Sequence, residues 1–242
     1  MQPQGGLPWG PAPILRGIPM GFDFEPGVML DAVPVLLTGV KLTIIITIVG
    51  LFFGFILGAA AGLLKISRNI LLRKLSGSYV EFIRGTPLMV QVMFLYFGLP
   101  MAIGIRIPPL TAGIVTIALN SGAYIAEIVR GAVQSINPGQ TEAARSIGLT
   151  RFQAMRYVVW PQALKRMIPP LGNQFIISLK DTSLLVVIGV GELTRTGQEI
   201  ISVSFRAFEV WLTVAIMYLI LTMTISKILN VVEVKIFRVG RK

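Results

Sequence analysis

Polar side chains that can contact a solute recur at helical spacing inside apolar stretches of this sequence. Gln174, Ser178 and Asp181 are four and three residues apart, so a helix would place them on one face. A second set repeats that spacing earlier in the chain: Asn120, Tyr124 and Glu127. A charged side chain inside an apolar segment is costly and by default marks a functional site. We therefore expect the two sets to line a water-filled path.

The residue types that the chain lacks exclude much of enzyme chemistry. Its 242 residues include no Cys and no His, which excludes disulfide frameworks, thiol nucleophiles and Ser-His triads. The sequence also lacks the G-x-x-x-x-G-K-S/T phosphate loop, so the chain is not expected to hydrolyse ATP itself. We expect no catalytic residue, no metal site and no cofactor in this chain.

Composition and charge indicate a membrane protein. Hydrophobic residues make up 54% of the chain, mean hydropathy is +0.76, and only 14% of the residues are charged. Lys and Arg outnumber Asp and Glu by 22 to 11, a surplus that on a polar surface would suggest nucleic-acid binding. On so apolar a chain we expect the surplus to set membrane topology and to face anionic lipid headgroups. No nucleic-acid partner is expected.

Long apolar runs predict an all-α integral membrane protein with five transmembrane helices. A bilayer core about 30 Å thick needs about 20 apolar residues in a helix. The predicted spans are residues 35–64, 80–104, 108–131, 167–190 and 208–231. Most basic residues fall after the first and third spans and in the C-terminal tail. The positive-inside rule then places the N-terminus outside and the C-terminus in the cytoplasm.

One transmembrane domain, residues 35–235, accounts for most of the chain. Residues 1–34, rich in Pro and Gly, are expected to be an irregular extracytoplasmic extension without a cleaved signal peptide. Residues 236–242 are expected to be a basic cytoplasmic tail. In the first span, glycines at every fourth position predict close packing against a neighbouring helix: Gly50, Gly54, Gly58 and Gly62.

The connection between the third and fourth spans, residues 137–161, contains the signals of two short helices. Asn137 is suited to cap a helix that begins at the following proline, and Gly148 to end it in the left-handed conformation. Thr150 and Gln153 have the spacing of a capping box, which opens a second helix that re-enters the membrane. This connection is expected to be a rigid cytoplasmic projection suited to a groove on a partner.

The same connection resembles the EAA loop of ATP-binding-cassette importer permeases. Glu142-Ala143-Ala144 is followed after three residues by Gly148, and after nine more by V-V-W-P at residues 158–161. The spacing matches the family pattern, which ends in I-x-L-P, so the first and third of the last four residues are departures. In that family the loop docks into a cleft on a cytoplasmic ATPase subunit. The resemblance implies coupling to such a subunit for Glu142, Ala143, Ala144 and Gly148.

Other segments resemble the polar amino acid branch of these permeases, and the resemblance covers roughly residues 33–235. The segments are residues 82–87, 120–127, 169–175 and 180–184, while residues 92–102, 189–201 and 205–211 most resemble the glutamine permease subunit. The resemblance implies a permease subunit that forms the pathway of an ATP-driven amino acid importer, with glutamine as substrate, in the bacterial cytoplasmic (inner) membrane. It implies a second permease subunit (a homodimer is favoured), two ATPase subunits that hold ATP and Mg, and an extracytoplasmic amino-acid-binding protein.

Within that family, Asp181 is expected to meet the α-ammonium group of the amino acid, while Gln174 and Asn120 present amides. An amide donates and accepts hydrogen bonds without a charge, which favours a neutral amide substrate. Alternatively, Asp181 pairs with Arg84 or Lys180 and only holds the helices together. Charged residues elsewhere on the spans are interpreted as gate or interface ion pairs: Glu81, Arg84, Glu127, Arg130 and Lys180.

Two other functions stay open on the sequence. The chain could be an importer permease for another polar amino acid, such as glutamate, arginine or histidine. An ion-coupled secondary transporter is the alternative from a different class. It would need an internal repeat or an ion site, and the sequence shows neither a duplicated half nor broken helices in matching positions.

Overall fold

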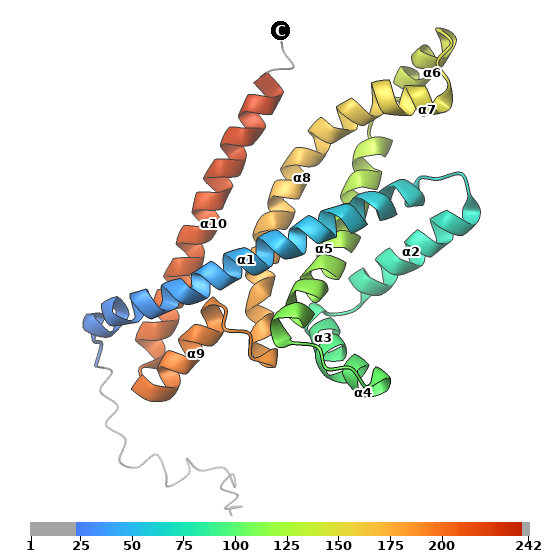
Figure 1. Ribbon diagram of the computed structural model, residues 1–242. Helices are drawn as coiled ribbons and strands as arrows, with labels where there is room; N and C mark the ends of the chain where they lie inside the picture. The colour runs from blue at the N-terminus through green and yellow to red at the C-terminus, as the bar shows by residue number, and fades with distance from the viewer. Residues whose placement is uncertain (1–22, 239–242) are drawn as a thin grey trace, which may run out of the picture.

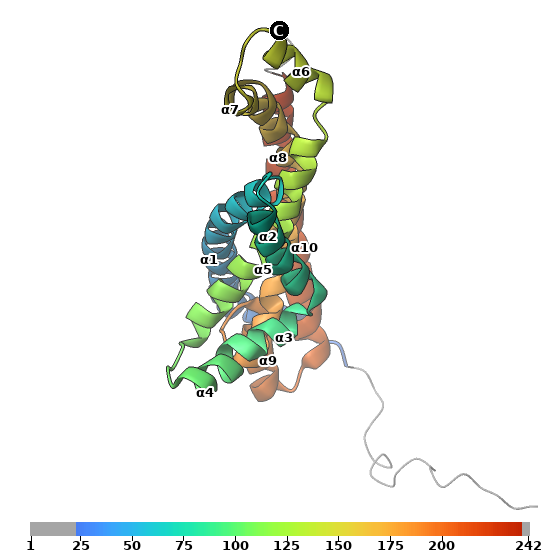
Figure 2. The same cartoon turned by 90° about the vertical axis from the view of Figure 1, so that its right-hand side faces the viewer.

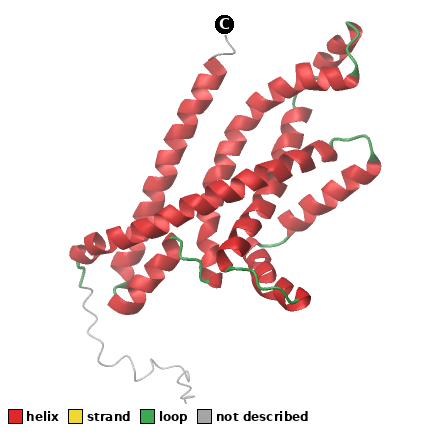
Figure 3. Ribbon diagram, in the orientation of Figure 1, coloured by secondary structure: helices red, strands yellow, loops and turns green. Residues whose placement is uncertain are grey.

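The structure, a computed structural model, describes residues 23–238, and all of its regular elements are helical. Figure 3 shows helices joined by short connections, with no strand among the described residues. The elements are α1 (Pro26–Lys65), α2 (Ile70–Gly85), α3 (Leu88–Met93), η2 (Phe94–Gly98), α4 (Leu99–Ile103), α5 (Pro109–Gln134), α6 (Pro138–Ser146), α7 (Arg151–Ala154), η3 (Met155–Val159), α8 (Trp160–Asp181), η4 (Thr182–Ile188), α9 (Leu193–Ser204) and α10 (Ala207–Arg238).

The helices extend between two ends of the molecule. The α6 end carries α6, α7 and the C-terminal end of α10, and the α9 end carries α4, α9 and the N-terminal end of α1 (Figure 1). The view turned by 90° shows the same separation of α6 and α7 from α4 and α9 (Figure 2). Helices α5, α8 and α10 run between the two ends, and α1 crosses them obliquely (Figure 1).

Four helical stretches are long and apolar enough to cross a membrane. They are Pro26–Lys65, Pro109–Gln134, Arg151–Ile188 and Ala207–Lys235. A fifth crossing exists if Ile70–Gly85 and Leu88–Ile103, which are bent by 104° at their junction, form one span. The prediction of an all-helical membrane protein is therefore confirmed for the described residues.

The second predicted span, residues 80–104, is wrong as a single helix, because the chain turns sharply between α2 and α3. Pro87 has no N–H and disfavours the helical conformation of Thr86, whose φ and ψ are −114° and 140°. The buried side-chain amide of Gln91 donates to the carbonyl oxygens of Ile83 at 2.7 Å and Thr86 at 3.0 Å. One glutamine thus provides a hydrogen bond to two backbone carbonyl groups at the break.

The first and last helices are longer than predicted. Helix α1 begins at Pro26 rather than near residue 35, so residues 26–34 are not irregular. A proline in the first helical turn loses no hydrogen bond, which explains why the helix begins there. At the other terminus, α10 continues to Arg238 and takes in part of the predicted tail. Residues 1–22 and 239–242 of the two predicted end segments lie outside the described residues.

The fourth predicted span, residues 167–190, is one part of a longer helix. Residues Arg151–Ile188 form a continuous helical stretch in which the π-helical turn η3 precedes α8 and the 3-10 segment η4 follows it. Asp181 is the last residue of α8, toward the α9 end. The second helix of the projection and the span that follows it form a single element.

Helices α1 and α5 pack against each other through the glycines of α1. A Cβ atom on Gly58 would lie 2.6 Å from the carbonyl oxygen of Gly122 and 2.7 Å from the Cβ of Ile125. A Cβ atom on Gly62 would lie 2.7 Å from the carbonyl oxygen of Ala126. Close packing is confirmed for all four predicted positions, each of which faces α5: Gly50, Gly54, Gly58 and Gly62.

Candidate functional site

The α6–α7 segment, residues 137–154, has both of the predicted helix starts. The Oδ1 of Asn137 accepts a hydrogen bond from the N–H of Gly139 at 2.8 Å. The N–H of Thr150 donates to Oε1 of Gln153 at 2.8 Å, and the N–H of Gln153 donates to Oγ1 of Thr150 at 3.3 Å. The predicted capping box is therefore confirmed.

Gly148 ends α6 with φ at 92°, a value that side chains rarely tolerate. The N–H of Gly148 donates to the carbonyl oxygen of Arg145 at 3.1 Å, and the N–H of Leu149 to that of Ala144 at 3.2 Å. These two bonds form a Schellman motif, which satisfies the last carbonyl groups of the helix. The predicted glycine turn between the two short helices is confirmed.

The α6–α7 segment presents an exposed face to the surroundings. Glu142 and Ala143 are exposed, whereas Ala144 is only 4% exposed and supports α6 from beneath. Three large apolar side chains lie open along the same segment and the turn that follows it: Ile147 at 79%, Phe152 at 71% and Tyr157 at 63%. Apolar side chains gathered at such exposure are typical of an interaction site.

One side-chain contact ties this segment to α8, and further contacts join α8 to α5 beside it. Arg166 of α8 donates to the carbonyl oxygen of Ser135 at 2.5 Å and to its hydroxyl at 2.9 Å. The side chain of Gln162 donates to that of Gln140 on α6 at 3.3 Å. Trp160 packs against a buried cluster that joins α5 to η3 and α8: Ile125, Val129, Ala132, Val133, Ile136, Val159, Ala163 and Met167. Helix α6 is therefore joined to α8 through Gln140, and α7 continues into α8 along the chain.

A second candidate feature is a group of charges around Glu127, here the Glu127 cluster: Lys65, Arg84, Glu127 and Arg130. Glu127 accepts from Lys65 at 2.5 Å and from Arg130 at 2.7 and 3.0 Å. Arg84 lies farther away, at 4.0 Å. Sequence reasoning missed Lys65, which it placed in a loop although the residue closes the last turn of α1.

Two predicted ion-pair residues form no ion pair within the described part of the chain. Glu81 and Lys180 are both exposed. The proposed pairing of Arg84 with Asp181 is wrong, because Arg84 lies beside Glu127 instead. Asp181 is half-buried and has no hydrogen bond or ion pair among the described residues.

The two predicted polar faces do not pair with each other. The buried Asn120 donates to Oε1 of Gln91 at 3.3 Å, which ties α5 to the break between α2 and α3. The buried Gln174 donates to Oγ of Ser178 at 3.2 Å. No hydrogen bond joins one set to the other within the described range. Sequence reasoning did not single out Gln91, although it is a lone amide in an apolar run.

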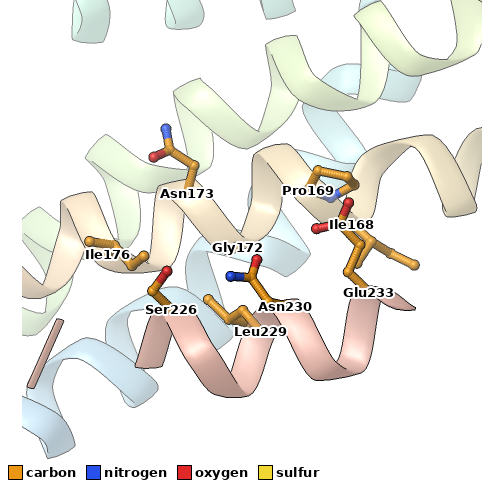
Figure 4. A pocket seen from close by; sticks show the side chains of 9 residues that line it. All are labelled: Ile168, Pro169, Gly172, Asn173, Ile176, Ser226, Leu229, Asn230 and Glu233. Carbon is orange, nitrogen blue, oxygen red and sulfur yellow. The ribbon is translucent and has the colours of Figure 1, made fainter. Parts of the chain in front are cut away.

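A cavity of about 190 Å³ lies between α8 and α10. Figure 4 shows Ser226, Asn230 and Glu233 extending from α10 toward α8. None of these three side chains has a hydrogen bond or an ion pair within residues 23–238. On the α8 side, Pro169 lines the cavity, and with Pro170 it removes two N–H donors from the helix. This helix pair is therefore looser and more polar than the glycine contact between α1 and α5.

Helix α9 is fixed at the other end of the molecule by a buried carboxylate. Glu192 accepts from the N–H groups of Thr194 at 2.9 Å and Arg195 at 2.8 Å, and from the hydroxyl of Tyr218 at 2.9 Å. Burial raises the pKa of the Glu192 carboxyl above its usual value. Sequence reasoning missed this cap. Its signal is an acidic residue immediately before the first turn of a helix.

Comparisons with known sequences agree with this arrangement. The family described as "Binding-protein-dependent transport system inner membrane component" matches residues 50–238. The chain is 52% identical over 215 residues to the glutamine transport system permease protein GlnP of Escherichia coli (strain K12), covering 88% of this chain and 97% of GlnP. It is 38% identical over 206 residues to the probable glutamine ABC transporter permease protein GlnM of Bacillus subtilis (strain 168), covering 85% and 95% of the two chains.

Solved structures share the fold. One is a crystal structure of an amino acid ABC transporter with histidines, with a TM-score of 0.84 and 41% identity over 88% of this chain and 99% of that chain. Another is the MetNI methionine ABC transporter in an inward-facing conformation, with a TM-score of 0.72 and 27% identity over 82% and 94% of the chains. Sequence and fold agree along almost the whole described chain, which therefore belongs to the family of inner-membrane components of binding-protein-dependent transport systems.

Proposed function

We propose that this chain is the transmembrane permease subunit of an ATP-driven amino acid importer, with glutamine as its substrate. The observation that carries the proposal is the 52% identity to a glutamine permease across nearly the full length of both chains. The capped and exposed α6–α7 segment supports it, because a chain without a phosphate loop needs a docking site for a separate ATPase.

The partners follow from the same proposal. Two ATPase subunits hold ATP and Mg, and each docks on one α6–α7 segment, where Glu142, Ala143, Ala144 and Gly148 couple the subunits. A second copy of this chain completes the pathway, and an extracytoplasmic binding protein delivers glutamine. The α6 end then faces the cytoplasm and the N-terminus lies outside, with the bent pair α2 and α3 as the fifth span.

A reconstituted system tests this function. The chain is co-expressed with its ATPase subunit, inserted into proteoliposomes with the binding protein, and assayed for ATP hydrolysis with glutamine, glutamate, arginine and histidine. Glutamine should stimulate hydrolysis and uptake most. Uptake that persists without ATP and follows an ion gradient would instead favour the secondary transporter.

Another polar amino acid is the second candidate substrate. A structure 41% identical to this chain is described with histidines, and another relative of Bacillus subtilis, 38% identical, is an L-cystine permease. Strongest stimulation by histidine in the same screen, or by cystine added to it, would replace glutamine as the substrate and leave the importer function standing.

Docking of the ATPase has its own test. Glu142→Arg reverses a charge on the exposed face of α6 and should release the ATPase subunit from the purified complex. Glu199→Arg is the matched control, because it reverses an exposed carboxylate on α9, at the opposite end. Equal retention of the ATPase by both variants would contradict docking at α6.

Contact of Asp181 with the α-ammonium group of the substrate is part of the same proposal. Asp181 is half-buried and interacts electrostatically with the adjacent Lys180. Its side chain accepts no hydrogen bond among the described residues, so its oxygens are available for a ligand. Asp181→Asn should raise the transport KM. An unchanged KM together with unchanged ligand-stimulated ATP hydrolysis would remove Asp181 from the pathway.

A further inference from the structure

Arg84 lies in the last turn of α2, immediately before the chain turns into α3. Its guanidinium carbon is 5.1 Å from the centroid of the Tyr124 ring, which is the geometry of a cation–π contact. The arginine side chain is 43% exposed, and Tyr124 beneath it is 37% exposed. The pair therefore forms an open surface where α2 packs against α5.

Within the described residues, Arg84 has one distant carboxylate partner, which it shares with two other cations. Glu127 already accepts hydrogen bonds from Lys65 and Arg130 at 2.5 to 3.0 Å. Arg84 approaches the same carboxylate only to 4.0 Å, which is too long for a hydrogen bond. The Glu127 cluster thus holds three cations around one carboxylate. Arg84 is its outermost and least bonded member.

Inside a membrane domain, this excess of positive charge around Glu127 indicates an anionic ligand. An arginine between transmembrane segments normally pairs with an anion, since an unpaired charge there is costly. The fork of a guanidinium matches a carboxylate, which it binds through two parallel N–H bonds. The guanidinium of Arg84 contacts the Tyr124 ring and makes no hydrogen bond within the described residues, so its N–H donors are available for such a ligand.

We propose that Arg84 binds the α-carboxylate of the transported amino acid, and that Tyr124 holds the guanidinium in position for it. This proposal rests on the proposed function, which supplies an amino acid as the solute that passes the site. It changes the interpretation of Arg84 from a gate ion pair to a substrate contact. It also predicts that recognition depends on the free α-carboxylate, which all amino acid substrates share.

A binding experiment on the purified complex of permease and ATPase, without binding protein and in lipid nanodiscs, tests the proposal. Dissociation constants are measured for L-glutamine and for L-glutaminamide, in which an amide replaces the α-carboxylate. The wild type should prefer glutamine by about tenfold or more, because a charge-assisted pair is lost with the amide. Arg84→Gln should remove that preference, and Arg84→Lys should keep part of it, because lysine retains the charge without the fork.

Arg73→Gln is the matched control. It removes one positive charge from the opposite end of α2, where the side chain is exposed, and should leave the preference at the wild-type value. Retention of the full preference by Arg84→Gln would overturn the proposal. If Arg84→Gln fails to assemble, the comparison of Arg84→Lys with wild type decides, since an unchanged preference in that variant also overturns it.

Failure of the proposed function gives a different result. If the wild-type complex binds arginine or histidine but not glutamine, the glutamine assignment fails. The ratio of the dissociation constants is then measured for that amino acid and its amide. If the complex binds no amino acid, both proposals fall. If it binds glutamine and glutaminamide equally, only the role of Arg84 is lost.

Discussion

Helices α1 and α5 meet at a contact with no spare room, whereas α8 and α10 enclose a cavity of about 190 Å³. The first contact is made by glycines that bring two backbones together. The second contains two consecutive prolines on one helix and, on the other, polar side chains that have no partner among residues 23–238. Because α8 is continuous with the α6–α7 segment, the looser contact belongs to the helix that docking would move. We infer that α1 and α5 form the fixed frame and that α8 is the element that shifts.

The largest effect is expected from filling the tight contact. Gly58→Ala places a Cβ 2.6 Å from a backbone oxygen and should destabilise the protein by about 1–3 kcal/mol, the usual cost of overpacking. Gly77→Ala is the control, because a Cβ there meets nothing within 4 Å and should add about 0.5–1 kcal/mol of helix stability. Thermal unfolding of the purified complex measures both. Equal losses of stability in Gly58→Ala and Gly77→Ala would contradict a frame that depends on the close approach of α1 and α5.

The next largest effect, on transport rather than on stability, is expected from restoring the N–H donors of α8. In the double variant Pro169→Ala with Pro170→Ala, the helix regains two backbone hydrogen bonds and stiffens. Transport should fall several-fold while the melting temperature stays the same or rises. Pro109→Ala is the control, since a proline at the start of α5 replaces no helical bond. Transport at the wild-type rate in the double variant would show that α8 does not need to bend.

A smaller loss is expected where α7 begins. Thr150→Ala removes the hydroxyl that accepts from the N–H of Gln153 and should cost about 0.5–2 kcal/mol of local stability. Hydrogen exchange of the α7 amides should report this loss before global unfolding does. Ser202→Ala, which removes an exposed hydroxyl bonded to its own helix, should leave exchange unchanged. If α7 stays protected in Thr150→Ala, packing rather than capping holds the segment.

The smallest effect is expected in the looser contact. A Cβ on Gly172 would lie 3.3 Å from a terminal methyl carbon of Leu229, a flexible group that can move aside. Gly172→Ala should therefore change stability by about 0.5 kcal/mol or less. A loss as large as that of Gly58→Ala would remove the distinction between the two contacts.

The sequence predicted the features that depend on residues close to one another along the chain. The caps at Asn137 and Thr150, the turn at Gly148 and the glycine face of α1 are local or periodic patterns, and the structure confirms each of them. The sequence did not predict the 104° turn between α2 and α3, although Pro87 was visible. An apolar run does not show whether a proline bends a helix or breaks it, because the answer depends on side chains such as Gln91.

The candidate site was predicted less well than the fold. Helical spacing placed Asn120, Tyr124 and Glu127 on one face, but the three have different surroundings in the structure. Asn120 is buried against Gln91, Tyr124 is open beneath Arg84, and Glu127 is surrounded by cations. Those surroundings come from other helices, and spacing along one helix carries no information about them.

The length of the continuous helix Arg151–Ile188 and the position of its two prolines have a mechanical consequence. Its 38 residues extend about 57 Å at 1.5 Å per residue, nearly twice the roughly 30 Å of a bilayer core. Pro169 and Pro170 lie at its centre and divide it into two arms of about 27 Å each. Bending by about 10° at this joint would move the tip of one arm by about 5 Å, close to the pitch of one helical turn. A modest change of angle at the prolines would thus become a displacement as large as a turn of helix.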